Sequence, residues 1–363
     1  MNPTLLRVPG GRRLAPQVRT VSPAPRDAWD EVLDADPLAV PTQTPAWTDL
    51  TCRALGGLDA SRLYEYPDGR RLVLPLVARR RAGLRIAEES LPYGFGPGGP
   101  IVPGGRPTDE DMKVVLADLA TRPAVRTTLV PNPLLSEAWS DTTPPGGLRV
   151  EYLSYVLDLT GGFDAVLARY RAETRRNVRK AERQSLDVRM VRDRRLVEVF
   201  AGLNALSVDR WAHQRGQPLW LAHLVERHRD RVGLLRLAST GVGPECVGWT
   251  AHQDGLPIAA YVALFDRQSA FFWMSAMDKV LADRTRAGAL LQSRAIEHAC
   301  ARGMRWFHLG ESDPGSGVAR FKQGFGAVPL RLESLRFERV PLTAVEHRLR
   351  GAVGRLSRRG GAA

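Results

Sequence analysis

The spacing of apolar residues in the first half of the chain predicts short helices and strands in alternation. Residues 61–66 and 72–78 are apolar-rich runs on either side of Pro67-Asp68-Gly69, which is typical of a β-hairpin. Pro45 opens a helical pattern that runs through Leu55, and Pro is tolerated there because its missing N–H would be unpaired anyway. The other elements predicted in this half are a short helix from Asp27, a helix at 109–120 and a strand at 125–130.

The second half begins with a predicted strand at 151–157, followed by one long helix from Gly161. The middle of this helix is basic, and Arg175, Arg179 and Arg183 share one face because they are four residues apart. The elements predicted after it are helices at 196–211 and 218–230, an antiparallel meander of four strands at 233–239, 245–253, 257–265 and 268–275, a helix at 286–302 and a strand at 305–309.

Two segments rich in Pro and Gly interrupt these patterns. The segment 142–147 reads Thr-Thr-Pro-Pro-Gly-Gly and predicts a domain boundary. The loop 91–100 carries Tyr93 and Phe95, and fits either a binding loop or a tight packing corner. We therefore expect a flexible leader at 1–18, a first domain at 19–148, a second domain at 149–341, and a basic C-terminal helix and tail at 342–363.

Composition restricts the class of protein and of partner. The net charge of +13 favours a polyanionic partner such as RNA or a nucleotide-linked substrate, although abundant Arg, Ala, Gly and Pro are also typical of a GC-rich genome. No apolar run approaches the roughly 18 residues of a membrane span, and no signal core is apparent, so we expect a cytoplasmic protein without integral membrane association. Three widely spaced cysteines predict neither a disulfide framework nor a metal site.

One lysine stands out against this composition. Only four of the 52 basic residues are lysines, and one of them, Lys322, lies in the string Ala-Arg-Phe-Lys-Gln-Gly-Phe-Gly at 319–326. The guanidinium of Arg is planar and extended, whereas the ammonium of Lys is a compact charge at the end of a narrow side chain. A compact charge suits the stabilisation of an oxyanion. The sequence therefore offers Lys322 either as a catalytic cation or as an ordinary surface lysine.

Three separated segments resemble the FemX/FemAB family: the basic segment 170–183, the phrase Arg215-Gly216-Gln217-Pro218, and the run 290–326 with its Phe-Lys pair. The order of predicted elements in the second half is similar to that of a GNAT-class acyltransferase domain. The resemblance implies an α/β fold of two tandem GNAT-like domains, each with a mixed, largely antiparallel sheet flanked by helices. Residues 196–232 leave no room for the long coiled-coil arm of some members, which implies the compact form.

The resemblance also implies a site. Phe321 and Lys322 would lie beside the reacting ester, with Lys322 stabilising the oxyanion and Phe321 excluding water. The position of Glu311 and Asp313, in the loop between a predicted strand and the Lys motif, makes either a candidate to accept the proton or to orient Lys322; the alternative for Asp313 is that it starts a turn before Pro314. The residues expected to bind substrate or tRNA are Arg175, Arg176, Arg179, Lys180, Arg215, Tyr93, Phe95, Tyr261 and Trp273. For the basic helix, a solvated face paired with Glu173 and Glu182 is the alternative.

Three hypotheses for function follow. The first is an aminoacyltransferase that uses aminoacyl-tRNA as cosubstrate and joins the amino acid to an amine on an antibiotic-pathway molecule or a peptidoglycan precursor, with no permanently bound cofactor, no metal and no DNA partner. The second is an acyl-CoA-dependent N-acyltransferase, although residues 285–290 depart from the pyrophosphate-binding pattern Q/R-x-x-G-x-G/A at its first and last positions. The third is an RNA-binding module that has the fold without catalysis.

Overall fold

The structure is a computed structural model that describes residues 4–5, 18–92, 94–135, 147–241 and 243–343. The first half of the chain contains β1 (Thr4–Leu5), β2 (Arg19–Val21), α1 (Arg26–Asp34), the 3₁₀ turn η1 (Pro41–Gln43), α2 (Pro45–Leu55), β3 (Leu58–Asp59), β4 (Arg62–Glu65), β5 (Arg71–Leu74), β6 (Val77–Arg81), β7 (Leu84–Glu89), α3 (Asp109–Ala120) and β8 (Arg126–Leu129).

The second half contains β9 (Gly147–Asp158), α4 (Gly162–Arg169), α5 (Ala172–Glu182), β10 (Asp187–Val191), α6 (Arg194–Gln214), α7 (Leu219–Arg229), α8 (Arg231–Ala238), β11 (Glu245–Gln253), β12 (Leu256–Asp266), β13 (Ser269–Met277), α9 (Lys279–Thr285), α10 (Ala287–Ala301), β14 (Trp306–Glu311), α11 (Gly317–Gly324) and β15 (Val328–Glu338). The fold is thus a mixed α/β fold, as the sequence predicts.

Local capping chemistry explains why the predicted helices of the first half form. Thr44 accepts a hydrogen bond from the Trp47 N–H at the start of α2, next to Pro45 in the first turn. Thr108 and Asp111 satisfy each other's backbone N–H groups in a capping box at the start of α3. These helices match the predicted ranges because their signals are local.

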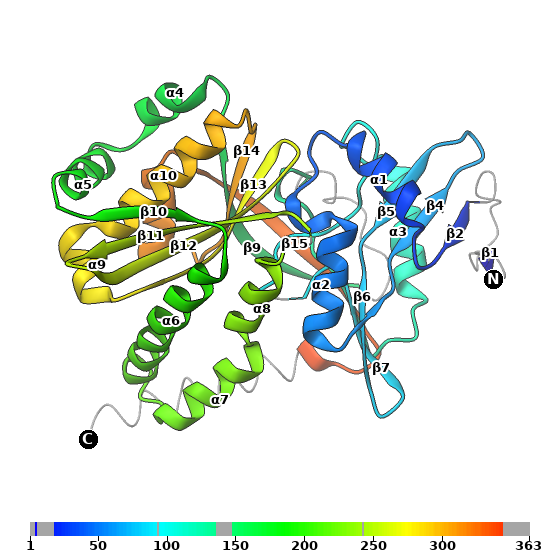
Figure 1. Cartoon of the computed structure of the whole chain (residues 1–363). Coiled ribbons are helices and arrows are strands. Elements are labelled where there is room, and N and C mark those ends of the chain that lie inside the picture. Colours follow the sequence, from blue (N-terminus) through cyan, green and yellow to red (C-terminus); the bar gives the residue numbers. More distant parts are fainter. Residues whose placement is uncertain (1–3, 6–17, 93, 136–146, 242, 344–363) are drawn as a thin grey trace.

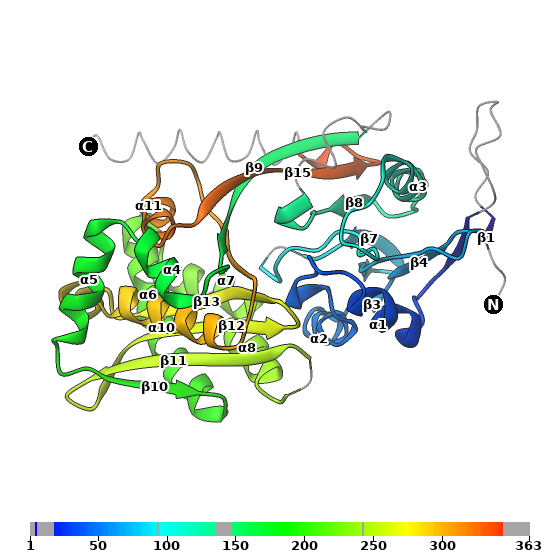
Figure 2. The same cartoon turned by 90° about the horizontal axis from the view of Figure 1, so that it is seen from above.

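Most strands of both halves join one eleven-stranded sheet, in the order β10-β11-β12-β13-β14-β9-β15-β8-β7-β6-β3. The pairs β13–β14 and β7–β8 are parallel and the rest are antiparallel. A smaller sheet has the order β1-β2-β4-β5. In Figure 2, β9 and β15 run side by side from the second half of the chain to the first, where β15 pairs with β8. This strand, the last one in the described part of the chain, therefore ties the two predicted domains together.

Helices cover both faces of the sheet in the second half (Figure 1). α4, α5 and α10 pack on one face around Leu290 and Val178, and α6 and α8 pack on the other around Phe200 and Leu235. α2 of the first half joins this second cluster through Trp47. No described helix has the length and hydropathy of a membrane span.

Two predicted elements of the second half were wrong. Residues 233–238 of the predicted strand 233–239 belong to helix α8, where the Asp230 side chain caps the Gly233 N–H, and β10 is the first strand of the meander instead. The single long helix divides at Tyr170 into α4 and α5, because Tyr170 is extended with ψ 137°. A run of apolar residues without clear period does not distinguish a buried helix from a strand, so long-range packing decided residues 233–239.

The Gly-rich loop at 91–100 is a packing corner between the two halves. The indole of Trp47 donates to the Phe95 carbonyl at 2.9 Å, and that of Trp273 donates to the Gly94 carbonyl at 3.2 Å. The two indole rings meet edge to face with centroids 5.0 Å apart. Of the two interpretations of this loop, the structure favours the packing corner.

Candidate active site

The candidate site forms where β13 and β14 part. These parallel strands pair only over Ser269–Phe271 and Trp306–His308, after which each continues without the other. On its other side β14 pairs with β9 through a bulge between His308 and Gly310. Gly310 has φ +73°, in the left-handed region that a glycine adopts without strain. The bulge turns the end of β14 toward α11.

Lys322 lies on α11 and reaches this bulge. Its side chain is buried, with 5% of the residue exposed. The Nζ atom donates to the Gly310 carbonyl at 3.0 Å, the Glu311 carbonyl at 2.9 Å and the Ser312 hydroxyl at 2.8 Å. It also lies 5.5 Å from the centre of the Tyr155 ring, a cation–π contact. Lys322 is therefore not an ordinary surface lysine.

The Lys322 ammonium is held by neutral oxygens alone. An ammonium has three N–H donors, and the three contacts of Lys322 use all of them. Among the described residues, no carboxylate comes within ion-pairing distance of its Nζ. Burial lowers the pKa of Lys322 to about 8, and the more distant Glu311 charge opposes the shift. The charge is thus retained at neutral pH but is easily lost above it.

Glu311 lies near the ammonium, and Tyr152 lies near Glu311. The Glu311 residue is exposed, but the protein atoms around its carboxylate raise its pKa by desolvation, and the Lys322 charge opposes that rise. A raised pKa makes a carboxylate a better proton acceptor near neutral pH. The Tyr152 hydroxyl is buried and has no hydrogen-bond partner within the described chain, and both burial and Glu311 raise its pKa.

The exposed part of α11 leads to the basic helix α5. Phe321 is 41% exposed and packs edge to face on Phe325, with ring centroids 5.1 Å apart. Phe325 packs in turn on Tyr170, and the Arg171 N–H at the start of α5 donates to the Gly324 carbonyl at 2.8 Å. The structure therefore brings the Phe-Lys pair and the basic helix into direct contact. Asp313 lies in the exposed turn before α11.

The basic residues of α5 have different surroundings. Arg175 caps α4, because its guanidinium donates to the carbonyls of Ala168 and Tyr170. Arg176, Arg179 and Lys180 are exposed, and no ion pair of theirs occurs among the residues that the structure describes. Glu182 pairs with Arg294 instead. The alternative of a helix face neutralised by Glu173 and Glu182 therefore does not hold for these three cations.

The remaining predicted binding residues lie apart from Lys322. Phe95 and Trp273 pack in the core between the two halves. Tyr261 is buried on β12 against Trp249 and Phe272. Arg215 is exposed at the end of α6, and Tyr93 lies outside the described residues.

Three residues of the site were not predicted. Ser312 accepts from Lys322, Tyr155 lies against the ammonium, and Tyr152 holds an unpartnered hydroxyl near Glu311. Ser312 had a sequence signal, since it follows the predicted strand next to Glu311. The tyrosines had none, because β9 is far from Lys322 in sequence.

The start of α10 corresponds to the degenerate pyrophosphate pattern. α9 runs directly into it through Arg286, which is left-handed with φ +62°. Ala287, the first residue of α10, has no exposed surface, whereas Gly288 after it is partly exposed. Phosphates use the free N–H groups at a helix start, and here the first of these residues is covered.

Comparisons with known proteins bear on the fold. Residues 168–323 match the family model of the acetyltransferase (GNAT) domain. The structure of FemX superposes with a TM-score of 0.59 at 11% identity, covering 88% of this chain and 97% of FemX. The fold expected from the FemX/FemAB resemblance is thereby confirmed.

Two further structures are similar. A conserved protein of unknown function from Bacteroides thetaiotaomicron has a TM-score of 0.52 at 13% identity, covering 86% of this chain and 97% of that one. The C-terminal domain of a putative lysylphosphatidylglycerol synthetase from Agrobacterium fabrum has a TM-score of 0.49 at 14% identity, covering 89% and 96%. No curated protein matches the sequence. The match to the acetyltransferase (GNAT) domain supports an acyltransferase activity at the level of class.

Proposed function

We propose that this chain is an aminoacyltransferase that takes an amino acid from aminoacyl-tRNA and joins it to an amine on a small molecule or a peptidoglycan precursor. The observation that carries the proposal is the buried Lys322 ammonium, whose three acceptors include only one side chain, that of Ser312. A serine rotamer changes easily, whereas the two carbonyls are fixed in the bulge. One N–H of Lys322 is therefore available to an incoming oxyanion when Ser312 turns away.

The reaction needs little from the protein beyond position and charge. The amine nitrogen attacks the ester carbonyl, a C–N bond forms, and the C–O bond to the tRNA ribose breaks. The proton of the attacking amine passes to Glu311, whose raised pKa suits an acceptor, and then to the departing ribose hydroxyl. Lys322 stabilises the tetrahedral oxyanion, a contribution of roughly 2.7 to 4 kcal/mol for one well-placed donor.

The surface around α11 supports a nucleic-acid carrier for the acyl group. Arg176 and Arg179 are exposed and uncompensated on a helix that contacts α11 directly. Cations on such a surface bind phosphates without base specificity. Phe321 offers an exposed aromatic face between these cations and Lys322, where a terminal base can stack.

The alternative is an acyl-CoA-dependent N-acyltransferase, which the GNAT match at 168–323 favours. The covered start of α10 weighs against it, because coenzyme A would need a different phosphate contact. The two candidates differ in the carrier and not in the transfer step, so an experiment on the carrier separates them.

The test is amide formation by the full-length protein with a mixture of charged tRNAs and a panel of amines, in parallel with acetyl-CoA. We expect product only with charged tRNA, and none when the tRNA is digested with RNase beforehand. Product that survives RNase treatment, or that forms with acetyl-CoA alone, contradicts the proposal. Lys322→Met is the inactive control and Lys113→Met, at an exposed lysine of α3, is its active counterpart.

A further inference from the structure

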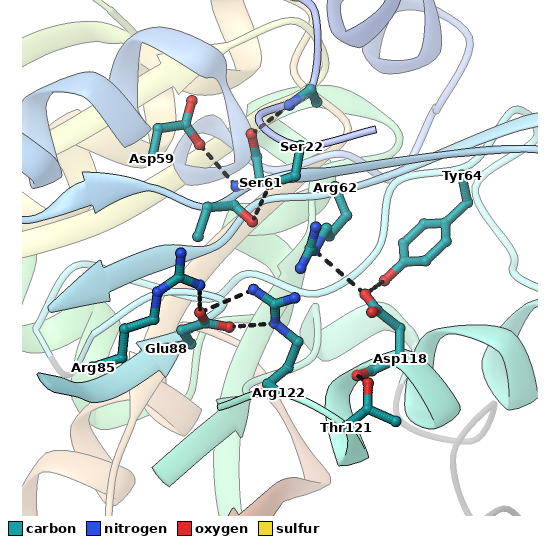
Figure 3. Close-up of polar contacts among 12 residues, drawn as sticks. Ser22, Asp59, Ser61, Arg62, Tyr64, Arg85, Glu88, Asp118, Thr121 and Arg122 are labelled. Carbon is teal, nitrogen blue, oxygen red and sulfur yellow. Dashed lines mark hydrogen bonds and ion pairs between the residues drawn. The ribbon is translucent and has the colours of Figure 1, made fainter. Parts of the chain in front are cut away.

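A cavity of about 500 Å³ lies within the first half of the chain and shares no residue with the Lys322 site. It is lined by residues from the segment after β2, from β3, β4, β6 and β7, and from the segment after α3. Figure 3 shows the polar side chains around it, with three guanidinium groups approaching from three different elements. Its volume is within the range of small-molecule sites.

Two of these guanidinium groups share one buried carboxylate. Glu88 has no exposed surface, and it accepts from Arg85 at 2.6 Å and from Arg122 at 2.7 and 3.1 Å. Glu88 uses one nitrogen of Arg85 and two of Arg122. Each arginine therefore keeps nitrogen donors for another acceptor.

The third guanidinium, that of Arg62, is the least satisfied. Its side chain is 10% exposed, and its Nε lies 3.4 Å from the Asp118 carboxylate, too poorly placed for a hydrogen bond. The same carboxylate oxygen accepts from the Tyr64 hydroxyl at 2.8 Å. No described residue accepts a hydrogen bond from the terminal nitrogens of Arg62. A buried guanidinium with so few acceptors is costly unless something else binds it.

Arginines outnumber carboxylates on one wall of the cavity. There the guanidinium groups of Arg62, Arg85 and Arg122 contact only the carboxylates of Glu88 and Asp118. Asp59 on the facing wall pairs with Arg26 at 3.0 Å, and Arg26 also pairs with Asp49, so the wider set of charges is neutral. An anion in the cavity would bind the guanidinium nitrogens that these carboxylates leave unused.

Apart from Ser22 and Asp59, the rest of the wall is apolar. Leu58 is 49% exposed at the cavity, and Pro23, Ala60, Ala78 and Pro123 line it as well. A bare inorganic ion would fill little of this volume and leave the apolar surface in water. A ligand with an anionic head and a compact apolar body satisfies both parts of the wall.

We propose that this cavity is a binding site for a small organic anion, whose phosphate or carboxylate group lies between Arg62, Arg85 and Arg122 and whose apolar part packs on Leu58. Planar guanidinium forks match both headgroups in bidentate geometry. The site lies outside the transfer machinery, so it is independent of the proposed function.

The test is isothermal titration calorimetry of the full-length protein with phenyl phosphate, with benzoate, and with phenol as the neutral counterpart, at constant ionic strength. We expect saturable one-to-one binding of at least one anion and much weaker binding of phenol. Arg85→Gln should lower the affinity for that anion about ten- to a hundredfold, which is the effect of losing one charge-assisted contact.

The matched control is Arg79→Gln on the neighbouring strand β6, which breaks a similar ion pair with Glu89 but does not line the cavity. The affinity of this variant for the anion should stay within twofold of that of the unmodified protein. The proposal is overturned if neither anion binds, if phenol binds as tightly, or if Arg85→Gln binds like Arg79→Gln. Should Arg85→Gln fail to fold, Arg122→Gln is compared with the same control and the same criteria apply.

Discussion

The molecule buries cations in two different ways. In the first half, Arg62, Arg85 and Arg122 lie against the carboxylates of Glu88 and Asp118. In the second half, Lys322 lies against two carbonyls and a hydroxyl. The first group is held by charge pairing and the second by dipoles alone.

This difference determines what each cation can do. An arginine keeps its proton in any environment, so pairing it with carboxylates creates a fixed structural charge. A lysine without a paired carboxylate has a lowered pKa, and no counter-ion competes with an anion that forms next to it. The first arrangement suits structure and anion binding, and the second suits the stabilisation of a transient oxyanion.

The largest expected effect comes from breaking the arginine arrangement. Asp118→Asn keeps an oxygen for the Tyr64 hydroxyl but leaves Arg62 buried without a countercharge, so the free energy of unfolding should fall by about 3 to 5 kcal/mol. Chemical denaturation measures this loss. Asp109→Asn, at an exposed position in the first turn of the same helix, should cost at most about 1 kcal/mol, and equal losses would show that Asp118 has no special role.

The next effect concerns catalysis at Lys322. Lys322→Met should lower kcat by about a hundred- to a thousandfold with little change in KM, because the lost contact exists only in the transition state. Lys322→Arg should not restore the rate. Lys322 is 5% exposed, and the planar guanidinium of an arginine does not fit the closed space around the lysine side chain. Single-turnover amide formation is the measurement, with Lys113→Met as control. A rise in KM at constant kcat would instead assign Lys322 to binding.

The pKa of Lys322 predicts how stability changes with pH. The folded-state pKa of about 8 is below the ordinary value of 10.5, so the unfolded chain binds more protons between these values. Relative to Lys322→Met, the unmodified protein should therefore gain about 3 kcal/mol as the pH rises from 8 to 10.5, with no gain below 8. Urea unfolding of both proteins across this range tests the sign. A constant difference would mean that Lys322 titrates normally.

The smallest effect is expected at the exposed cations of α5. Arg176→Gln combined with Arg179→Gln should weaken the binding of charged tRNA about tenfold. The slope of log affinity against log salt concentration should fall by the equivalent of about one to two phosphate contacts. The kcat at saturating tRNA should not change. Filter binding at several salt concentrations measures both. Arg80→Gln combined with Arg81→Gln, at exposed arginines of the β6–β7 hairpin, is the matched control. Equal losses in both double variants would indicate a nonspecific effect of net charge.

The sequence indicated Lys322 and the cations of α5, but it did not indicate the cavity at Arg62. Lys322 was found because a single lysine in an arginine-rich chain is unusual, and the cations of α5 were found from their spacing. The cavity at Arg62 was not found, because its three arginines come from separate elements in an arginine-rich background. Phe95, Tyr261 and Trp273 were expected to bind substrate or tRNA, yet they lie in the core, where large aromatic side chains most often pack.

Among the secondary-structure elements, locally capped helices were the easiest to predict. α2 and α3 carry a capping residue and an apolar face within about twelve residues, and these are short-range properties. α11 was missed because it is a short helix between glycines, which disfavour helix interiors. It forms because Lys322 and Ala319 are buried on one face, against β9 and the end of β14.

By itself, the sequence determined the α/β class, the helices with local caps, the FemX-like resemblance and the choice of Lys322. Only the tertiary structure decided that β15 joins the two halves in one sheet, that Lys322 is held by neutral oxygens, and that three arginines meet in one cavity. The physical reason is the same in each case. Strand partners, burial and charge pairing depend on residues far apart in the chain, whereas capping and periodicity depend on neighbours.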